Sequence, residues 1–212
     1  MAKAVLTISS KNYGAWALRG WLMAKLAGLD CTEKVIPPDD PAMKAEMLLL
    51  SSSMLVPSLQ HGSVKVWDTL AIAEYLAEQF PDKQLWPAAR AARARARSIC
   101  AEMHSGFTAL RSHCPMNIEA HLPDTGALIW RDKAGVRDDV QRLVDMWSAL
   151  LAEHGGPLLF GSFTVADAYF APVCMRLKTY VLPVPPAIAA YVDRVSALPG
   201  VQAWITEALA EK

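Results

Sequence analysis

The pattern of hydrophobic residues changes near residue 80 of this 212-residue chain. Before that point, β-branched and apolar runs typical of strands alternate with helical spacing. Beyond it, strand signals almost vanish, and helical periodicity interrupted by prolines continues to the end of the chain. A chain of this length can form one large domain or two small ones. We therefore predict an α/β domain over residues 1–80, a linker over 81–88 and an all-α domain over 89–212.

The first domain carries its strand and helix signals in the order βαβ and then ββα, which is typical of a small sheet covered by helices. The predicted elements are a strand at 4–9, a helix at 16–27, a strand at 31–36, a loop at 37–42 that can start another helix, a strand at 56–59, a turn at 61–62, a strand at 63–67 and a helix at 69–79.

Charge and hydropathy narrow the classes of partner. The chain carries 21 basic and 21 acidic side chains, so its net charge of zero gives no long-range attraction to nucleic acid or to an anionic membrane. Its apolar runs are all much shorter than the ~20 residues of a membrane span, and its first residues do not resemble a signal peptide. We expect a cytoplasmic protein with small-molecule or protein partners, and neither nucleic-acid nor membrane binding.

The four cysteines give no sign of a metal centre or a disulfide framework. They are far apart in the sequence and form no CxxC pair. We predict that they are buried, inert side chains and that the protein has no metal site. The cysteines are Cys31, Cys100, Cys114 and Cys174.

A proline interrupts the predicted strand at 56–59. Pro57 has no N–H to donate to a sheet, but the Val56–Pro57 bond can be cis at modest cost, which turns the neighbouring backbone groups outward. An extended, peptide-like ligand can then pair with Val56 as an additional strand.

Ten residues later, a strand runs directly into a helix at Asp68 and Thr69. The start of a helix offers unpaired N–H groups and a partial positive charge, which suit a ligand carboxylate. Thr69 adds a hydroxyl, and Asp68 can pair with an ammonium group. The ligand indicated is a short peptide with an amino-acid head group. An edge-strand proline and an Asp helix cap explain the same residues equally well.

Four segments together resemble the cytosolic glutathione transferase family, and the match covers essentially the whole chain in the family's order. VPSL is similar to the family's cis-proline element, WDTLAIAEYLAEQFP to its acid-then-hydroxyl helix start, LWPAARAARARARS to the entry into its helical domain, and GSFTVADAYFAPV to its buried N-capping box. The resemblance is to Ser-type, zeta- or theta-like bacterial members without fixing the class. It implies a thioredoxin-like first domain, a helical second domain, glutathione as cosubstrate and a homodimer.

The capping box also follows from the residues themselves. The Thr164 hydroxyl can accept a hydrogen bond from the Asp167 backbone N–H, and the Asp167 carboxylate can accept one from the Thr164 N–H. We interpret both residues as determinants of folding and not as catalysts.

The residue that activates the glutathione thiol departs from the family pattern. Members of the family use a Tyr, Ser or Cys near the first strand and helix, and these positions correspond here to Ile8, Asn12 and Gly14. We rank Asn12 first as the thiol-contacting donor, Ser10 second and Tyr13 third. Alternatively, Ser10 and Asn12 are turn or helix-cap residues, and Tyr13 lines the substrate pocket.

Two further sets of contacts follow from the resemblance. Leu55 stands where many relatives place a Lys or Gln that contacts glutathione. Unless Lys44 or another residue substitutes, one carboxylate contact is lost and affinity is expected to be weak. The electrophile pocket is expected to involve Tyr13, Met103, Phe107 and Arg111. Arg111 would hold an anionic substrate or the glutathione carboxylate; the alternatives are an interdomain ion pair for Arg111 and core packing for Met103 and Phe107.

We interpret the chain as a glutathione transferase that conjugates the glutathione thiolate to a small hydrophobic or anionic electrophile. Two alternatives remain open: a non-catalytic binding or scaffold protein on the same fold, and a glutathione-dependent isomerase or hydrolase of a small organic acid. Residues 49–55 and the first turns after Arg90 are possible dimer surfaces.

Overall fold

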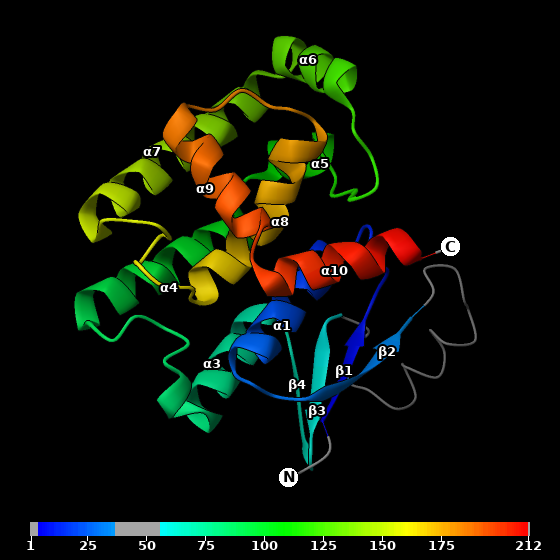
Figure 1. Cartoon of the computed structure of the whole chain (residues 1–212), viewed down its shortest axis with the longest axis vertical. Coiled ribbons are helices and arrows are strands. Elements are labelled where there is room, and N and C mark those ends of the chain that lie inside the picture. The colour runs from blue at the N-terminus through cyan, green and yellow to red at the C-terminus, as the bar shows by residue number, and fades with distance from the viewer. Residues whose placement is uncertain (1–3, 37–55, 212) are drawn as a thin grey trace.

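The structure, a computed structural model, describes residues 4–36 and 56–211 (Figure 1). Three of the sequence predictions lie outside the described residues: the roles of Leu55 and Lys44, the loop at 37–42 and the surface at 49–55.

The N-terminal domain has a four-stranded mixed sheet with strand order β2-β1-β3-β4. β1 and β2 are parallel, whereas β3 is antiparallel to both β1 and β4. The predicted βαβ and ββα order is confirmed. Its elements are β1 (Ala4–Ile8), α1 (Ala15–Leu26), β2 (Cys31–Val35), β3 (Ser58–His61), β4 (Val64–Trp67) and α3 (Thr69–Gln79).

Pro57 lies before β3 and not within it. The antiparallel register pairs Thr7 with Ser58, so the ladder between β1 and β3 begins one residue after the proline. The predicted strand at 56–59 is therefore corrected to 58–61. The Val56–Pro57 peptide bond is cis, as the sequence allowed.

The regular secondary structure of the described chain after α3 is helical apart from one isolated β-bridge, between Phe160 and Ser162. A short 3₁₀ helix, η1, follows α3 within the predicted linker. The helical elements are η1 (Pro81–Lys83), α4 (Arg90–Ser105), α5 (Thr108–His113), α6 (Pro123–Asp132), α7 (Ala134–His154), α8 (Val165–Thr179), α9 (Pro186–Ser196) and α10 (Pro199–Ala210).

Helix α8 forms the centre of the core and packs against α1, α4 and α9 (Figure 1). Its predicted capping box is confirmed: the Thr164 N–H donates to Asp167 over 3.0 Å, and the Ala166 N–H donates to the Thr164 hydroxyl over 3.3 Å. The fully buried Asp167 carboxylate also accepts from the Leu159 N–H and the Tyr191 hydroxyl, each over 3.1 Å. Because a buried carboxylate needs donors, these bonds fix the start of α8.

The loop between β1 and α1 is held by the C-terminal helix, which lies beside α1 in red in Figure 1. The Lys11 ammonium is buried between Glu33 and Glu207, at 2.5 Å from the Glu33 carboxylate. The Glu211 carboxylate accepts from the Lys11 N–H over 2.6 Å, and the Trp204 indole donates to the Lys11 carbonyl over 2.9 Å. The conformation of this loop therefore depends on α10.

None of the helices within the described ranges is both long and apolar enough to cross a membrane. Across the same ranges, no three His, Cys, Asp or Glu side chains gather as they would around a metal ion. All four cysteines are free thiols, and burial raises the pKa of Cys31 and Cys114 to about 11. At neutral pH these thiols are protonated and therefore poor nucleophiles.

Candidate functional site

Two adjoining cavities lie between the domains and share Trp16 and Val56 as lining residues. We call the larger, of about 430 Å³, the loop cavity, and the smaller, of about 220 Å³, the cap cavity. The loop cavity is lined by Ser9, Tyr13, Gly14, Ala15, Trp16, Val56, Thr108, Arg111, Ser112 and Arg176. The cap cavity is lined by Trp16, Val56, Pro57, Asp68, Thr69 and His104. The cap cavity thus brings together four residues predicted to hold the peptide of glutathione: Val56, Pro57, Asp68 and Thr69.

Asp68 caps α3 with one carboxylate oxygen and presents the other toward the second domain. Oδ1 accepts from the Leu70 N–H over 2.8 Å, and Oδ2 lies 3.2 Å from Nε2 of His104. Asp68 has a φ of 70°, a left-handed conformation that Asp tolerates better than most residues. Its side chain is 40% exposed, so a ligand ammonium can reach it.

Thr69 is almost completely buried, and its hydroxyl lies 2.6 Å from the hydroxyl of Tyr169 on α8. The same tyrosine hydroxyl lies 2.8 Å from Nδ1 of His104. Burial raises the pKa of the Tyr169 phenol, so it remains a neutral hydrogen-bonding group. Sequence reasoning missed Tyr169; the only signal was a polar aromatic residue in an otherwise apolar segment of α8.

The three candidate thiol donors point in different directions. The Ser10 hydroxyl donates to Glu211 over 2.7 Å. Oδ1 of Asn12 accepts from the N–H groups of Ile118 and Glu119, at 2.7 and 3.0 Å, and the residue is buried. Neither Ser10 nor Asn12 lines a cavity of the site, whereas Tyr13 lines the loop cavity and is 58% exposed.

The start of α1 opens onto the loop cavity. Its cap residue, Gly14, has no side chain that could bond the first N–H groups of the helix. Gly14, Ala15 and Trp16 all line the cavity. The first N–H groups of a helix have no partner within it and carry a partial positive charge. The Ala15 N–H donates to the Tyr13 carbonyl over 2.9 Å, so the groups that could stabilise an anion here are the N–H groups that follow it. Sequence reasoning did not identify this end of the cavity, because it is made of backbone groups.

Two arginines also line the loop cavity, and both donate to backbone carbonyl groups. Arg111 donates to the carbonyls of His104 and Gly106, at 3.2 and 3.3 Å. Nε of Arg176 donates to the Cys114 carbonyl over 2.8 Å. These bonds fix both guanidinium groups. Arg176 was not identified from the sequence, where it is one of many arginines.

A third arginine, Arg19, lies behind Trp16 and is fully buried. Its guanidinium is 4.3 Å from the centre of the Trp16 ring, and Nε donates to the Tyr169 carbonyl over 2.8 Å. Burial lowers the pKa of Arg19 to about 9 and that of Arg176 to about 10, so both remain cations at neutral pH.

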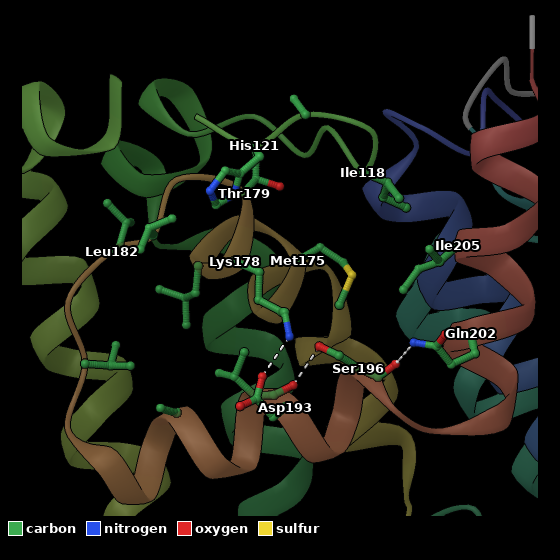
Figure 2. A pocket seen from close by; sticks show the side chains of 16 residues that line it. Ile118, His121, Met175, Lys178, Thr179, Leu182, Asp193, Ser196, Gln202 and Ile205 are labelled. Carbon is green, nitrogen blue, oxygen red and sulfur yellow. Dashed lines mark hydrogen bonds and ion pairs between the residues drawn. The ribbon is translucent and has the colours of Figure 1, made fainter. Parts of the chain in front are cut away.

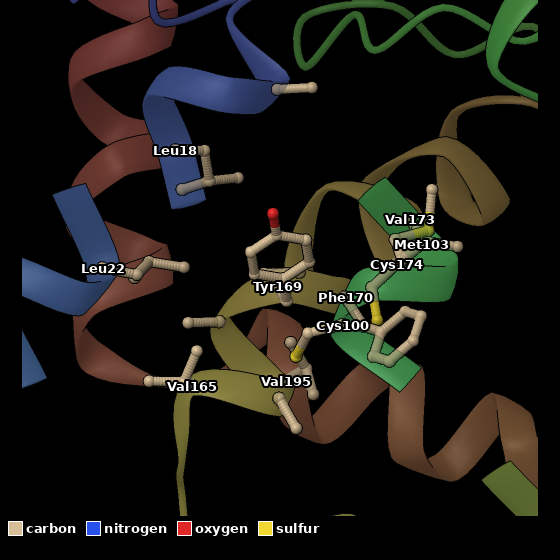
Figure 3. Packing of buried hydrophobic residues seen from close by; sticks show 14 of the residues in the cluster. Leu18, Leu22, Cys100, Met103, Val165, Tyr169, Phe170, Val173, Cys174 and Val195 are labelled. Atoms are coloured by element: carbon tan, nitrogen blue, oxygen red, sulfur yellow. The ribbon is translucent and has the colours of Figure 1, made fainter. Parts of the chain in front are cut away.

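Met103 and Phe107 were expected to form an apolar wall of the substrate pocket, but the structure places both in the core. Met103 is fully buried on α4 beside α8 (Figure 3). Phe107 caps α5 in a left-handed conformation and is 6% exposed. Neither lines the loop cavity or the cap cavity. Helical spacing predicted that both residues lie near Arg111, but it cannot show which residues face the core.

A third cavity, of about 460 Å³, lies among α8, α9, α10 and the segment 118–121 (Figure 2). It shares no lining residue with the other two cavities. Its cation Lys178 is paired with Asp193 at 2.7 Å. Because its other lining residues are mostly apolar, it offers little chemistry, and we place the functional site at the two joined cavities.

Comparison with known proteins identifies the family of the chain. Residues 13–79 match the family model for the N-terminal domain of glutathione S-transferase, and residues 87–207 match the model for its C-terminal domain. Glutathione S-transferase 1 of Dianthus caryophyllus is 29% identical over 161 residues, which cover 74% of this chain and 70% of that protein.

Solved structures give the same result. A glutathione transferase homolog from Burkholderia gl BGR1, with bound glutathione, is 26% identical, covers 100% of both chains and has a TM-score of 0.73. A Tau class glutathione S-transferase of mango, Mangifera indica, is 19% identical, covers 98% of this chain and 96% of that chain, has a TM-score of 0.75 and shows the shared fold. Since the C-terminal model alone spans more than half of the sequence and the two models follow in order, the chain belongs to the glutathione S-transferase family.

Proposed function

We propose that this glutathione transferase binds glutathione through the cap cavity and Val56, and transfers its thiolate to a small electrophile in the loop cavity. The observation that supports this most strongly is the junction of the two cavities at Trp16 and Val56. A peptide that occupies the cap cavity with its head group can extend past Val56 into the second cavity. Its reactive end would then lie beside the start of α1.

The γ-glutamyl head group is assigned to the cap cavity. Its ammonium would pair with Oδ2 of Asp68, because Oδ1 already caps α3. Its carboxylate would bind the N–H groups at the start of α3, where Thr69 is the first residue. The Thr69 hydroxyl contributes to this site as part of the pair with Tyr169. The remainder of glutathione would run along Val56 and Pro57, with Leu55 next to them in sequence.

We assign the thiolate to the start of α1, with Tyr13 as its side-chain donor, because Tyr13 is the one of the three candidate donors that lines the loop cavity. This assignment replaces the ranking that places Asn12 and Ser10 first, because neither residue lines a cavity of the site. The Ser10 hydroxyl donates to Glu211, and buried Asn12 is held through its oxygen by the second domain. A free thiol has a pKa near ~8.5, and lowering it by two units requires about 2.7 kcal/mol of preferential thiolate stabilisation. Helix N–H groups and one hydroxyl are suited to supply this.

The test is calorimetric titration of the purified protein with glutathione, followed by assays with electrophiles. Asp68→Asn keeps a side-chain oxygen for the helix cap and removes the charge, and we expect it to weaken glutathione binding by about tenfold. Asp82→Asn, at an exposed position on η1, is the matched control and should bind as the parent does. Equal affinities for Asp68→Asn and the parent would remove Asp68 from the site.

A non-catalytic binding protein on the same fold is the second candidate function. It is favoured by one observation: the two residues that begin α1 at the loop cavity, Gly14 and Ala15, have neither a hydroxyl nor a thiol. Saturable glutathione binding without turnover of any electrophile would favour this candidate. If binding does not saturate at millimolar glutathione, both candidate functions are contradicted, because each requires glutathione binding.

We also propose that the protein is a cytoplasmic homodimer, as the family resemblance implies. Light scattering on the purified protein gives the mass of the assembly directly. A mass near 46 kDa, twice the 23.1 kDa of the chain, is expected, and a mass of one chain would contradict the dimer.

A further inference from the structure

We propose that Arg111 and Arg176 bind a carboxylate of the second substrate, so that this transferase prefers small electrophiles that are themselves carboxylic acids. The inference rests on the proposed function for the reaction, but the anion site can be tested on its own.

The two arginines are fixed on different elements and line the same cavity. Arg111 comes from α5 and Arg176 from α8, and backbone carbonyl groups hold both guanidiniums. A guanidinium held in place loses little freedom when a carboxylate binds. Arginine presents several N–H groups in a plane, which suits the two oxygens of a carboxylate.

Within the described part of the chain, three arginines at the loop cavity and behind Trp16 have no ionic partner. Among residues 4–36 and 56–211, no Asp or Glu side chain forms an ion pair with Arg19, Arg111 or Arg176. Some other arginines in the same ranges are paired, as in Arg97 with Glu74 and Arg142 with Glu102.

Among Arg19, Arg111 and Arg176, the surroundings of Arg176 give the strongest argument for a bound anion. It is 6% exposed, and its Nη1 atom is buried without a hydrogen-bond partner in the described chain. A buried, incompletely bonded cation is costly unless an anion or water compensates it. Since Arg176 lines the loop cavity of about 430 Å³, an anionic ligand bound there would lie near this guanidinium and compensate its charge.

The two cavities have opposite charge. The cap cavity contains the carboxylate of Asp68, whereas the loop cavity contains the two arginines, with Arg19 stacked behind Trp16. Arg111 also lies against this ring, 5.1 Å from its centre. The ammonium of a glutathione head group is therefore favoured on one side of Trp16, and an acid on the other. This separation orients the two substrates.

An aromatic substitution makes the proposal specific. The glutathione thiolate attacks the ring carbon that bears chlorine in 4-chloro-3-nitrobenzoate; the C–S bond forms, the C–Cl bond breaks, and chloride leaves with the bonding pair. No oxidant or further reactant is needed. The neutral counterpart, 4-chloro-3-nitrobenzamide, reacts in the same way but has no carboxylate. Each enzymatic rate is divided by the uncatalysed rate of the same compound.

Equilibrium binding tests the site without catalysis. The probes are 3-nitrobenzoate and 3-nitrobenzamide, which have no leaving group, titrated into the parent protein, Arg111→Gln, Arg176→Gln and Arg194→Gln. Arg194 is the matched control, since it also donates to a backbone carbonyl, of Pro157, but is exposed on α9 and lines none of the three cavities. Glutathione is titrated into the same four proteins, and thermal unfolding confirms that each is folded.

We expect the parent and Arg194→Gln to bind the benzoate about tenfold more tightly than the benzamide, and Arg111→Gln to lose this preference. Arg176→Gln should lose it too; if that variant does not fold, Arg111→Gln decides. Equal binding of the two probes by the parent would overturn the inference. So would variants that keep the preference but bind glutathione more weakly, because the arginines would then hold the glutathione carboxylate. A preference for benzoate in a protein that does not bind glutathione would refute the proposed function and leave the anion site standing.

Discussion

The hydroxyl of Tyr169 lies 2.6 Å from the hydroxyl of Thr69, and this contact joins helix α8 of the second domain to the first residue of α3. The same tyrosine hydroxyl reaches His104, whose other ring nitrogen lies 3.2 Å from Asp68. One buried tyrosine thus connects the polar residues of the cap cavity. The geometry of that cavity is consequently a property of the domain contact and not of the first domain alone.

Tyr169→Phe should destabilise the protein, because it leaves the buried Thr69 hydroxyl without its partner. We expect a loss of about 1–3 kcal/mol in the free energy of unfolding, measured by urea denaturation. Thr69→Val removes the other partner. The double variant should lose less unfolding free energy than the sum of the losses in the two single variants. Strict additivity would mean that the two hydroxyls do not interact.

Ala15→Ser should lower the pKa of the bound glutathione thiol by about one unit, since one hydrogen bond to a charged group contributes about 1.5–3 kcal/mol. Ala15 already lines the loop cavity at the start of α1, so the change adds only an oxygen there. Gly14 is unsuitable because a Cβ at that position would lie 2.3 Å from the Ser10 carbonyl oxygen.

The pKa of the bound thiol is measured from the pH dependence of thiolate absorbance in the ultraviolet. Ala71→Ser, at an exposed position on α3, is the control and should leave this pKa unchanged. No change in Ala15→Ser would show that the sulfur does not lie at the start of α1.

The sequence was sufficient for the fold because the relevant signals are local. The helix that follows Asp68 begins and ends where its cap and apolar spacing predicted, and the box at Thr164 and Asp167 needs residues only three apart. Pro57 was placed in a strand that starts one residue later, since one sequence gives no register.

The site was less predictable because its members meet through tertiary packing. Arg176 comes within the same cavity as Arg111 only because α5 and α8 lie together at its wall. Asn12 had the right chemistry to contact a thiol, but its oxygen accepts from the N–H groups of Ile118 and Glu119, more than a hundred residues away. No periodicity or spacing encodes such contacts.

Stability should depend on pH through Glu33, which links β2 to Lys11 and to the Trp21 indole. Burial alone would raise the pKa of Glu33, but the hydrogen bonds from Lys11 and Trp21 outweigh it and hold that pKa below its ordinary value. A lowered carboxyl pKa stabilises the fold above the unfolded pKa of about 4.3, and this stabilisation is lost as the pH falls through the folded value.

Glu33→Gln should therefore unfold more easily at pH 7, by about 1 kcal/mol, and the difference from the parent should shrink below about pH 4. Urea midpoints at pH 7, 5, 4 and 3 measure this. Glu78→Gln, on the exposed face of α3, serves as control. A difference that stays constant over this range would exclude the contribution of Glu33.

Asp167→Ala should lower the melting temperature and the yield of soluble protein sharply. The change leaves buried donors of Leu159, Thr164 and Tyr191 without an acceptor, at a cost of about 1–3 kcal/mol each. Asp193→Ala, at an exposed position on α9, should have a small effect. An unchanged melting curve for Asp167→Ala would remove the assignment of this box as a determinant of folding.

Gly20→Ala should weaken glutathione binding through the backbone at Val56. A Cβ at position 20 would lie 2.7 Å from Cγ and 2.9 Å from Cβ of Pro57, and a proline ring cannot move out of the way by rotating. Alanine is the better helix former by about 1 kcal/mol, so propensity alone predicts a more stable α1. The steric contact opposes that gain and is expected to prevail, because it displaces Pro57 and with it Val56, which lines both cavities.

The same substitution elsewhere separates the two effects. Gly200→Ala, in the first turn of α10, would place its Cβ 3.3 Å from the end of the Leu22 side chain, which can adjust by rotation. We expect this variant to keep the glutathione affinity of the parent. Gly20→Ala should bind glutathione about tenfold more weakly, which is the loss expected for one misplaced hydrogen bond between the ligand and the backbone at Val56. If both variants bind glutathione equally well, the ligand does not depend on the position of Val56, and the placement of glutathione along this segment would have to be abandoned.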